Sequence, residues 1–358
     1  METHVWHAKR FHMTGESHGR WGYRLALYPN DKGARAAYRA VANKCLMTDM
    51  SYMGCVELRG KREDLEEGLG KIALAGADLG CKADQETHFW LRDQDQEVIG
   101  RASLVWKSCQ SVAWLWIHPA YFQQGFQALQ QAFDLRLEEP AQVDPGPEAK
   151  KPRMADKINE AKMANRNVPF DLRVPKFVSG TKAVSAFDLR DTLNRFRLVG
   201  PLAPTLLRQT LIPAEFVGFQ ENTSEEDGGA QFWWQSHYDE RPLQETALQL
   251  ENTKPRSVNY VVARDPRYIL PPKRGCVEQE ILQDGGEEVK KTVEGTRELS
   301  AIWSSEVRDA VTTSKIPDAT VNKRRSQRLV PGTAEPEDAE EAKVPTMLIH
   351  QARTRSHT

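Results

Sequence analysis

The hydrophobic and polar positions between residues 31 and 138 predict helices and strands in alternation. Apolar residues three and four positions apart predict a helix over residues 31–45, capped by Asp31. The same spacing predicts a second helix over about 62–75 and a third over about 119–138, which begins at a proline. Each of these helices has one apolar flank with which it can cover a core.

Runs rich in β-branched and aromatic residues lie between these helices and predict strands. The last run, Val112–Ile117, is apolar on both faces, which is typical of a strand at the centre of a sheet. The order strand, helix, three strands, helix predicts an α+β fold, mainly antiparallel sheets with helices on one face. The predicted strands are 51–58, 87–92, 98–106 and 112–118.

The second half of the chain carries weaker patterns of the same kind. The opening segment of the chain is compatible with a helix capped by Thr3. Extended segments are predicted at 170–178, 195–198, 258–262 and 344–350, and helices at 204–211, 302–313 and 320–328.

Two polar segments, the first of which contains four prolines, divide the chain into five predicted parts. These are an N-terminal α+β region (1–139), a flexible insertion (140–167), a continuation of the α+β core (168–272), a second flexible insertion (273–295), and a C-terminal part (296–358) with helices, an acidic loop and a terminal strand.

Charge is unevenly distributed although the 358 residues carry a formal net charge of only −1. Between Met1 and Lys44 there are eight Lys and Arg residues against three acids, so the amino end is basic. Five scattered cysteines without a Cys-x-x-Cys spacing favour a reducing compartment over a disulfide framework. No signal peptide and no apolar run of about eighteen residues is present, so we expect no membrane association, and cytoplasm and nucleus both stay open.

The first thirteen residues concentrate ring and cationic side chains. Aromatic planes beside Lys and Arg suit stacking on bases and neutralisation of phosphates. An amphipathic helix with core aromatics would have the same composition, and the two interpretations are equally compatible with the residues. The residues concerned are His4, Trp6, His7, Lys9, Arg10, Phe11 and His12.

Two further groups of cations have a regular spacing. Arg35 and Arg39 stand one helical turn apart and could follow a phosphate backbone, or form an ordinary solvated face. Beyond Asn194, Arg195 and Arg197 alternate with apolar residues, which predicts a strand with one cationic and one buried face. One of these arginines could instead pair with Asp191.

The sequence holds none of the motifs that build a catalytic site in the common enzyme classes. There is no phosphate-binding glycine loop, no nucleophile elbow and no cluster of carboxylates for two metal ions. His4 and His7 have a spacing that suits zinc, but no cysteine or carboxylate completes a shell nearby, so we expect no metal site. We therefore predict no catalytic residues and no metal bound by the protein.

Several segments together resemble the largest protein subunit of eukaryotic nuclear ribonuclease P and ribonuclease MRP. The resemblance covers nearly the whole chain apart from the polar insertions, and the first motif is its most specific part. The motifs are Glu2–Met13 with Trp21-Gly22-Tyr23, Ala37-Tyr38-Arg39-Ala40, Cys45-Leu46, Asp49–Tyr52, Leu193–Leu202, Asp265-Pro266-Arg267 and Leu329-Val330-Pro331-Gly332.

The sequence departs from the family pattern at three places. Residues 14–20 lengthen the join to Trp21, the basic region expected upstream of the first motif is missing, and so is the Gly/Trp-rich segment expected after the last strand. The resemblance therefore implies a chain truncated at both ends.

The resemblance implies a non-catalytic scaffold in a ribonucleoprotein whose RNA subunit hydrolyses phosphodiesters with magnesium ions. It implies ribonuclease P RNA and MRP RNA as partners, together with smaller protein subunits and, indirectly, precursor tRNA, in the nucleus and nucleolus. It also implies a core similar to the folate-binding aminomethyltransferase fold. The RNA contacts expected from it are His4, Trp6, His7, Lys9, Arg10, Phe11 and His12, followed by Arg35, Arg39, Asn194, Arg195 and Arg197.

Two other functions stay open at this stage. The fold resemblance raises a folate-dependent aminomethyltransferase-like enzyme as an alternative, although a shared fold supplies no site. The acidic insertions raise a protein–protein adaptor as a third hypothesis.

Overall fold

The computed structural model describes about half of the chain. The described residues are 11–14, 21, 23, 25–29, 33–80, 85–107, 111–138, 174–190, 192–212, 214, 256–268, 301–326 and 342–351. No helix within these ranges is long and apolar enough to cross a membrane.

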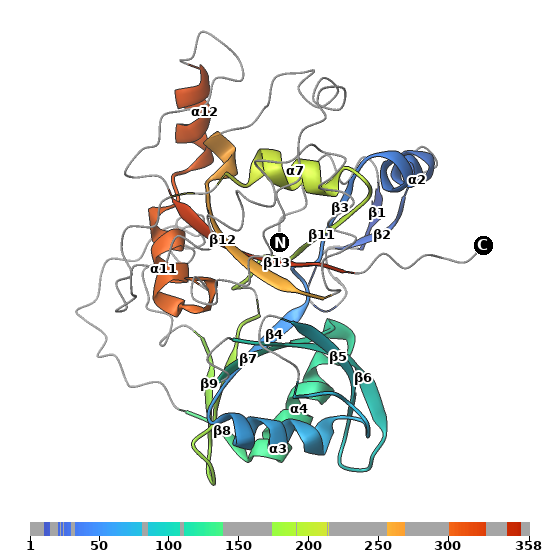
Figure 1. The fold of residues 1–358 in the computed structure, drawn as a ribbon, viewed down its shortest axis with the longest axis vertical. Helices are drawn as coiled ribbons and strands as arrows, with labels where there is room; N and C mark the ends of the chain where they lie inside the picture. Colours follow the sequence, from blue (N-terminus) through green and yellow to red (C-terminus); the bar gives the residue numbers. More distant parts are fainter. Residues whose placement is uncertain are drawn as a thin grey trace, which may run out of the picture.

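A seven-stranded antiparallel sheet is the largest sheet among the described residues and lies in the lower half of the view (Figure 1). Its strand order is β5-β6-β7-β4-β10-β9-β8, so β4 pairs with β7 on one side and with the distant β10 on the other. The strands are β4 (Gly54–Arg59), β5 (Glu86–Arg92), β6 (Val98–Trp106), β7 (Val112–Ile117), β8 (Leu135–Leu137), β9 (Lys176–Ser179) and β10 (Ser185–Asp188).

Helices α3 (Arg62–Ile72) and α4 (Phe122–Phe133) cover one face of this sheet. Their apolar flanks pack with alternate residues of the strands into the larger hydrophobic core, as their periodicity requires. The two helices approach closely at Gly68, where a Cβ atom would lie 2.1 Å from the Cε1 atom of Phe133. A larger residue at this position would force the helices apart.

The opposite face of the sheet carries a second core under an antiparallel ribbon of β12 (Val258–Arg264) and β13 (Lys343–Ile349). Trp114 of β7 packs against Trp303 of the 3-10 turn η4 (Ala301–Trp303), with 4.2 Å between the ring centroids. Trp303 donates a hydrogen bond from Nε1 to the Tyr260 hydroxyl at 3.1 Å. The ribbon therefore closes the second core.

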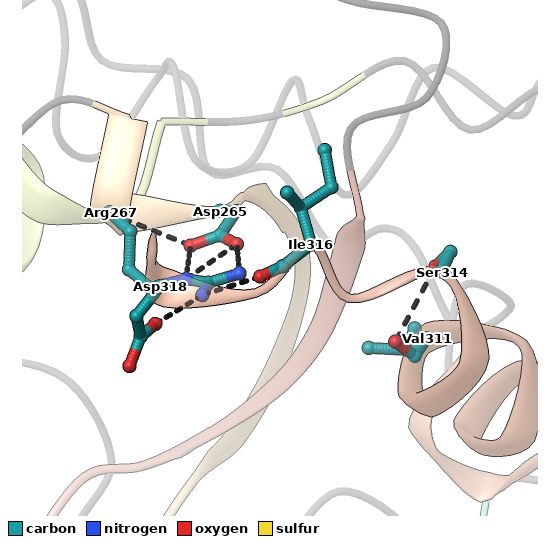
Figure 2. Close-up of polar contacts among 6 residues, drawn as sticks. All are labelled: Asp265, Arg267, Val311, Ser314, Ile316 and Asp318. Carbon is teal, nitrogen blue, oxygen red and sulfur yellow. Dashed lines mark hydrogen bonds and ion pairs between the residues drawn. The ribbon is translucent and has the colours of Figure 1, made fainter. Parts of the chain in front are cut away.

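Arg267 fixes the region after β12 to the linker between α11 (Ser305–Ser314) and α12 (Asp318–Ser326) and to the first residue of α12 (Figure 2). Its guanidinium forms a bidentate pair with Asp265, donates to the Ile316 carbonyl oxygen at 2.8 Å, and pairs with Asp318. The two carboxylates raise the pKa of Arg267 above its ordinary value. These contacts hold the start of α12 against the end of β12.

Two smaller ribbons complete the described strands. β1 (Phe11–Met13) pairs with β2 (Ala26–Pro29), and β3 (Leu46–Asp49) pairs with β11 (Phe196–Val199). Helix α2 (Gly33–Asn43) precedes β3 and contacts it, and α7 (Ala203–Thr210) follows β11. Figure 1 shows α2 and both ribbons gathered on one side of the view.

The antiparallel α+β class predicted from the sequence is confirmed, with both helices between β4 and β8 on one face of the main sheet. The third predicted helix is too long, because Asp134 adopts a left-handed conformation that ends α4 at Phe133, and β8 follows. Residues 11–13 form a strand and not the end of a helix, because they pair with β2. The predicted insertions 140–167 and 273–295 lie outside the described residues, and the division into parts stays a prediction.

Candidate nucleic-acid interface

Helix α2 presents cations and an aromatic ring on an open surface. Arg35 and Arg39 are exposed one turn apart, and Tyr38 between them is 76% exposed. The helix contains no acidic residue, and none of its side chains is buried. An eleven-residue helix gains little stability without buried side chains. We therefore expect a binding partner to cover the surface of α2.

The β3–β11 ribbon also exposes cationic and apolar side chains. Arg197 is exposed opposite Thr48, and Phe196 and Met47 are 51% and 61% exposed. Asn194, which precedes the ribbon, is also exposed.

Backbone contacts tie α2 to β11. Leu202 donates its N–H to the Lys44 carbonyl oxygen at 2.9 Å. Gly200 adopts φ +135, and a Cβ atom there would lie 2.3 Å from the same Lys44 oxygen. Only glycine permits so close an approach, so the Gly-Pro-Leu segment positions the end of α2 beside β11.

The β1–β2 ribbon carries a stacked pair of rings. The His12 and Tyr28 centroids are 4.4 Å apart with 27° between the planes, and both side chains are exposed. Phe11 is half-buried, and the Thr14 hydroxyl oxygen accepts the Leu25 N–H at 2.9 Å, which closes the ribbon. An exposed histidine stacked on tyrosine is a platform on which a further planar ring can stack.

Arg195 does not have the surface position predicted for it. Its side chain is 19% exposed, donates from Nη2 to Glu86 Oε1 at 2.9 Å, and lies 4.6 Å from the centre of the Trp116 ring. The backbone N–H of Arg195 donates to the Ser51 hydroxyl at 3.1 Å. Arg195 therefore anchors the β3–β11 ribbon to the main sheet, and the predicted alternation fails because the strand begins only at Phe196, which is itself exposed.

Glu86, the partner of Arg195, was not recognised in the sequence. It is fully buried, and its second oxygen, Oε2, lies 3.5 Å from His88 Nε2. Burial lowers the pKa of His88, an effect that Glu86 partly offsets. A cavity of about 360 Å³ lies beside these two residues, along β5 and the loop after α3. Because Arg195 already neutralises Glu86, we find no free acid–base pair there.

The remaining predicted contacts lie outside the described residues. The structure therefore brings Arg35, Arg39, Asn194 and Arg197 to exposed positions, together with His12, and adds Tyr28, Tyr38 and Phe196 to the candidate set. A tyrosine in an otherwise alanine- and arginine-rich helix was the one available signal for Tyr38. The undescribed residues are His4, Trp6, His7, Lys9 and Arg10.

No group of three or more His, Cys, Asp or Glu residues in the described parts of the chain could hold a metal ion. The exposed set can stack on planar rings and neutralise anions, and this combination is typical of proteins that bind nucleic acid.

Comparison with known proteins identifies the class of protein that the chain resembles, the protein subunits of the ribonucleases P and MRP. The N-terminal family model of the ribonucleases P/MRP protein subunit POP1 matches residues 1–61, which include α2, β1, β2 and β3. The resemblance stated from the sequence motifs is thereby confirmed.

Three relatives are likewise described as protein subunits of the ribonucleases P/MRP. Over an alignment 411 positions long, the chain is 29% identical to the human ribonucleases P/MRP protein subunit POP1, and the alignment covers 98% of this chain and 39% of that protein. It is 29% identical to popl-1 of Caenorhabditis elegans over 157 residues, which cover 40% of this chain and 19% of that protein. It is 27% identical to POP1 of Saccharomyces cerevisiae over 150 residues, which cover 37% of this chain and 17% of that protein. The chain thus spans about two fifths of the human relative and less than a fifth of the other two.

Among solved structures, the chain is similar to the glycine cleavage system aminomethyltransferase T from Bartonella henselae. The TM-score is 0.37 with 14% identity, covering 60% of this chain and 44% of that one. A score of this size carries no argument about fold or function, so the aminomethyltransferase-like core stays an expectation from the family resemblance.

Proposed function

We propose that the chain is an RNA-binding scaffold subunit of the ribonuclease P/MRP ribonucleoprotein, and that it has no catalytic role of its own. In this proposal the RNA subunit, with its magnesium ions, performs the hydrolysis that removes tRNA 5′ leaders and processes precursor rRNA. The names of the relatives support the subunit role. The surface chemistry supports RNA as the ligand.

The observation that carries the proposal is the exposed state of α2 and the β3–β11 ribbon. Arg35, Arg39 and Arg197 are exposed, and Tyr38 and Phe196 expose 76% and 51% of their surface. The helix carries no acid that would neutralise its arginines internally. Exposed guanidinium groups bind phosphate in a bidentate geometry, and the adjacent rings offer planes for unpaired bases.

Partners and location follow from the same proposal. Ribonuclease P RNA and MRP RNA would be bound directly, smaller protein subunits would dock on the assembled particle, and precursor tRNA would be contacted indirectly. The protein would bind no cofactor and no membrane, and it would reside in the nucleus and nucleolus.

The test measures RNA affinity of the full 358-residue chain over a range of salt concentrations. Replacing both Arg35 and Arg39 by alanine should weaken binding and make the log–log salt slope shallower by about one for each phosphate that the variant no longer neutralises. The matched control is Arg136→Ala in β8, because the Arg136 side chain is 79% exposed and lies outside the candidate interface. The proposal fails if the double variant and the control have the same affinity and slope.

A second variant addresses the first motif. Lys9→Ala combined with Arg10→Ala should reduce both affinity and slope in the same way. An unchanged salt slope would show that Lys9 and Arg10 do not contact phosphates, and the argument from α2 would still hold.

A further inference from the structure

A cluster of four rings lies at the end of β7 and includes Tyr52, which follows β3 in the chain. His118 is its centre, and the Trp21, Tyr52 and Tyr121 ring centroids lie 4.8, 5.9 and 5.7 Å from the His118 centroid. Trp21 and Tyr52 come from two separate motifs of the N-terminal region, and neither packs against a described hydrophobic core. Trp21 and Tyr52 therefore do not fill the described cores, whereas Tyr121 packs against the larger core.

His118 is held in one tautomer. Its Nδ1 accepts the Ala120 N–H at 3.1 Å and caps the turn before α4. Because Nδ1 is the acceptor, the neutral ring carries its proton on Nε2, and burial lowers the pKa of His118, which favours this neutral form. Nε2–H is then a hydrogen-bond donor of fixed orientation, with no hydrogen-bond partner among the described residues.

Tyr121 makes the cluster rigid on its inner side. Its ring lies against Gly100, where a Cβ atom would approach the ring to 2.5 Å, and its hydroxyl donates to the Arg101 carbonyl oxygen at 2.7 Å. A side chain on Gly100 would displace Tyr121 from His118. Rings fixed in advance lose little conformational entropy when a ligand binds.

Trp21 forms the open side of the cluster. The side chain is 40% exposed, and the ring meets His118 nearly edge to face, with 84° between the planes. Trp21 also adopts φ +56, a left-handed conformation that is strained for a bulky side chain and is concentrated at functional sites. The left-handed backbone therefore holds a partly exposed indole next to the His118 ring.

We propose that Trp21 and His118 form a binding site for one unpaired RNA base, which stacks on the open side of the indole and accepts a hydrogen bond from His118 Nε2. This site rests on the proposed RNA-binding function and adds to it a contact with bases, separate from the phosphate contacts of α2. A base within a duplex cannot enter, because both of its faces are already stacked. The site therefore selects single-stranded segments.

The test compares the affinity of the full chain for a twelve-nucleotide oligoadenylate and for a twelve-base-pair RNA duplex. Trp21→Ala should weaken oligoadenylate binding about tenfold, within the range measured for loss of one stacked base. Duplex affinity and the salt slope for both RNAs should stay unchanged, because no charge is removed. Trp90→Ala is the matched control, since Trp90 is 50% exposed and lies on β5 outside the cluster.

A second variant tests the donor. His118→Asn preserves an acceptor that can cap the turn, but it removes the ring and Nε2–H. It should weaken oligoadenylate binding several-fold while leaving the thermal midpoint close to that of the parent chain, which separates an effect on the base site from an effect on the fold.

The two proposals fail in different ways. If Arg35→Ala with Arg39→Ala weakens binding of both RNAs, but Trp21→Ala and Trp90→Ala behave alike, the base site is refuted and RNA binding stands. An equal loss for oligoadenylate and duplex in Trp21→Ala also refutes the base site. If the parent chain binds neither RNA at low salt, both proposals are refuted.

Discussion

Replacing Arg195 by methionine is expected to destabilise the fold. Methionine preserves an unbranched side chain of similar length but removes the cation that neutralises Glu86. The carboxylate is fully buried, and its closest remaining partner among the described residues is His88, at 3.5 Å and with a pKa that burial lowers. An uncompensated charge would then remain inside the protein.

The magnitude follows from the burial of the two partners. Removal of one member of a buried ion pair typically costs about 3–5 kcal/mol. The Arg195 side chain is 19% exposed, so some water reaches the site, and we place the loss at the lower end, about 3 kcal/mol. Removal of the guanidinium from the face of the Trp116 ring, whose centre lies 4.6 Å from the guanidinium carbon, acts in the same direction.

The assay is urea denaturation followed by tryptophan fluorescence, with the free energy of unfolding obtained from the midpoint and slope. Arg197→Met is the matched control, because Arg197 lies two residues away and is exposed. It should change stability by less than about 0.5 kcal/mol and should instead weaken RNA binding. Combining Arg195→Met with Glu86→Gln removes both charges and should recover at least about 2 kcal/mol of the loss.

Two results would refute this reasoning. One is a loss below about 1 kcal/mol in Arg195→Met, which would mean that water already solvates Glu86. The other is a double variant whose loss equals the sum of the two single variants, because independent effects exclude a direct interaction.

Two further predictions concern packing and pH. In α3, Gly68→Ala should lower the free energy of unfolding by about 1–3 kcal/mol, because the new methyl group overlaps the Phe133 ring. Gly70→Ala has no atom within 4 Å of the new methyl group and should raise the free energy of unfolding by about 0.5–1 kcal/mol. Equal effects of the two variants in urea denaturation would disprove the packing argument. Burial lowers the pKa of His88 and of His118 in the folded protein, so protons bind the unfolded chain more tightly, and stability present near pH 7 should be lost as the pH falls through about 6.5. A His88→Gln, His118→Asn double variant should lose less stability between pH 7 and about pH 5.5, and an unchanged pH dependence in urea titrations would contradict this assignment.

The parts of the fold that the sequence predicts are those with a strong local pattern. Val98–Trp106 forms the predicted strand, and Val112–Ile117, apolar on both faces, occupies an interior position in the sheet. In contrast, β3 and β10 are four residues long and of mixed composition. Their partners β11 and β4 lie more than a hundred residues away in the chain, so no local periodicity marks them as strands.

The candidate interface was predictable in composition but not in orientation. Arg35 and Arg39 are expected on one exposed flank, and they lie there. Arg195 faces inward because it pairs with the buried carboxylate of Glu86, 109 positions earlier in the chain. Such long-range pairing cannot be recognised in a single sequence. His118 gave no signal at all, since its ring neighbours come together only in the folded chain.

The position of β4 between β7 and β10 has a consequence for biosynthesis. Its second neighbour begins only at Ser185, so the edge of β4 lacks a partner while well over a hundred residues are translated. At typical elongation rates this interval is on the order of ten seconds, long compared with hairpin formation. During that time a nascent chain exposes an apolar strand edge to other polypeptides in the cell, so its yield should depend on chaperones that shield the growing chain until β10 arrives.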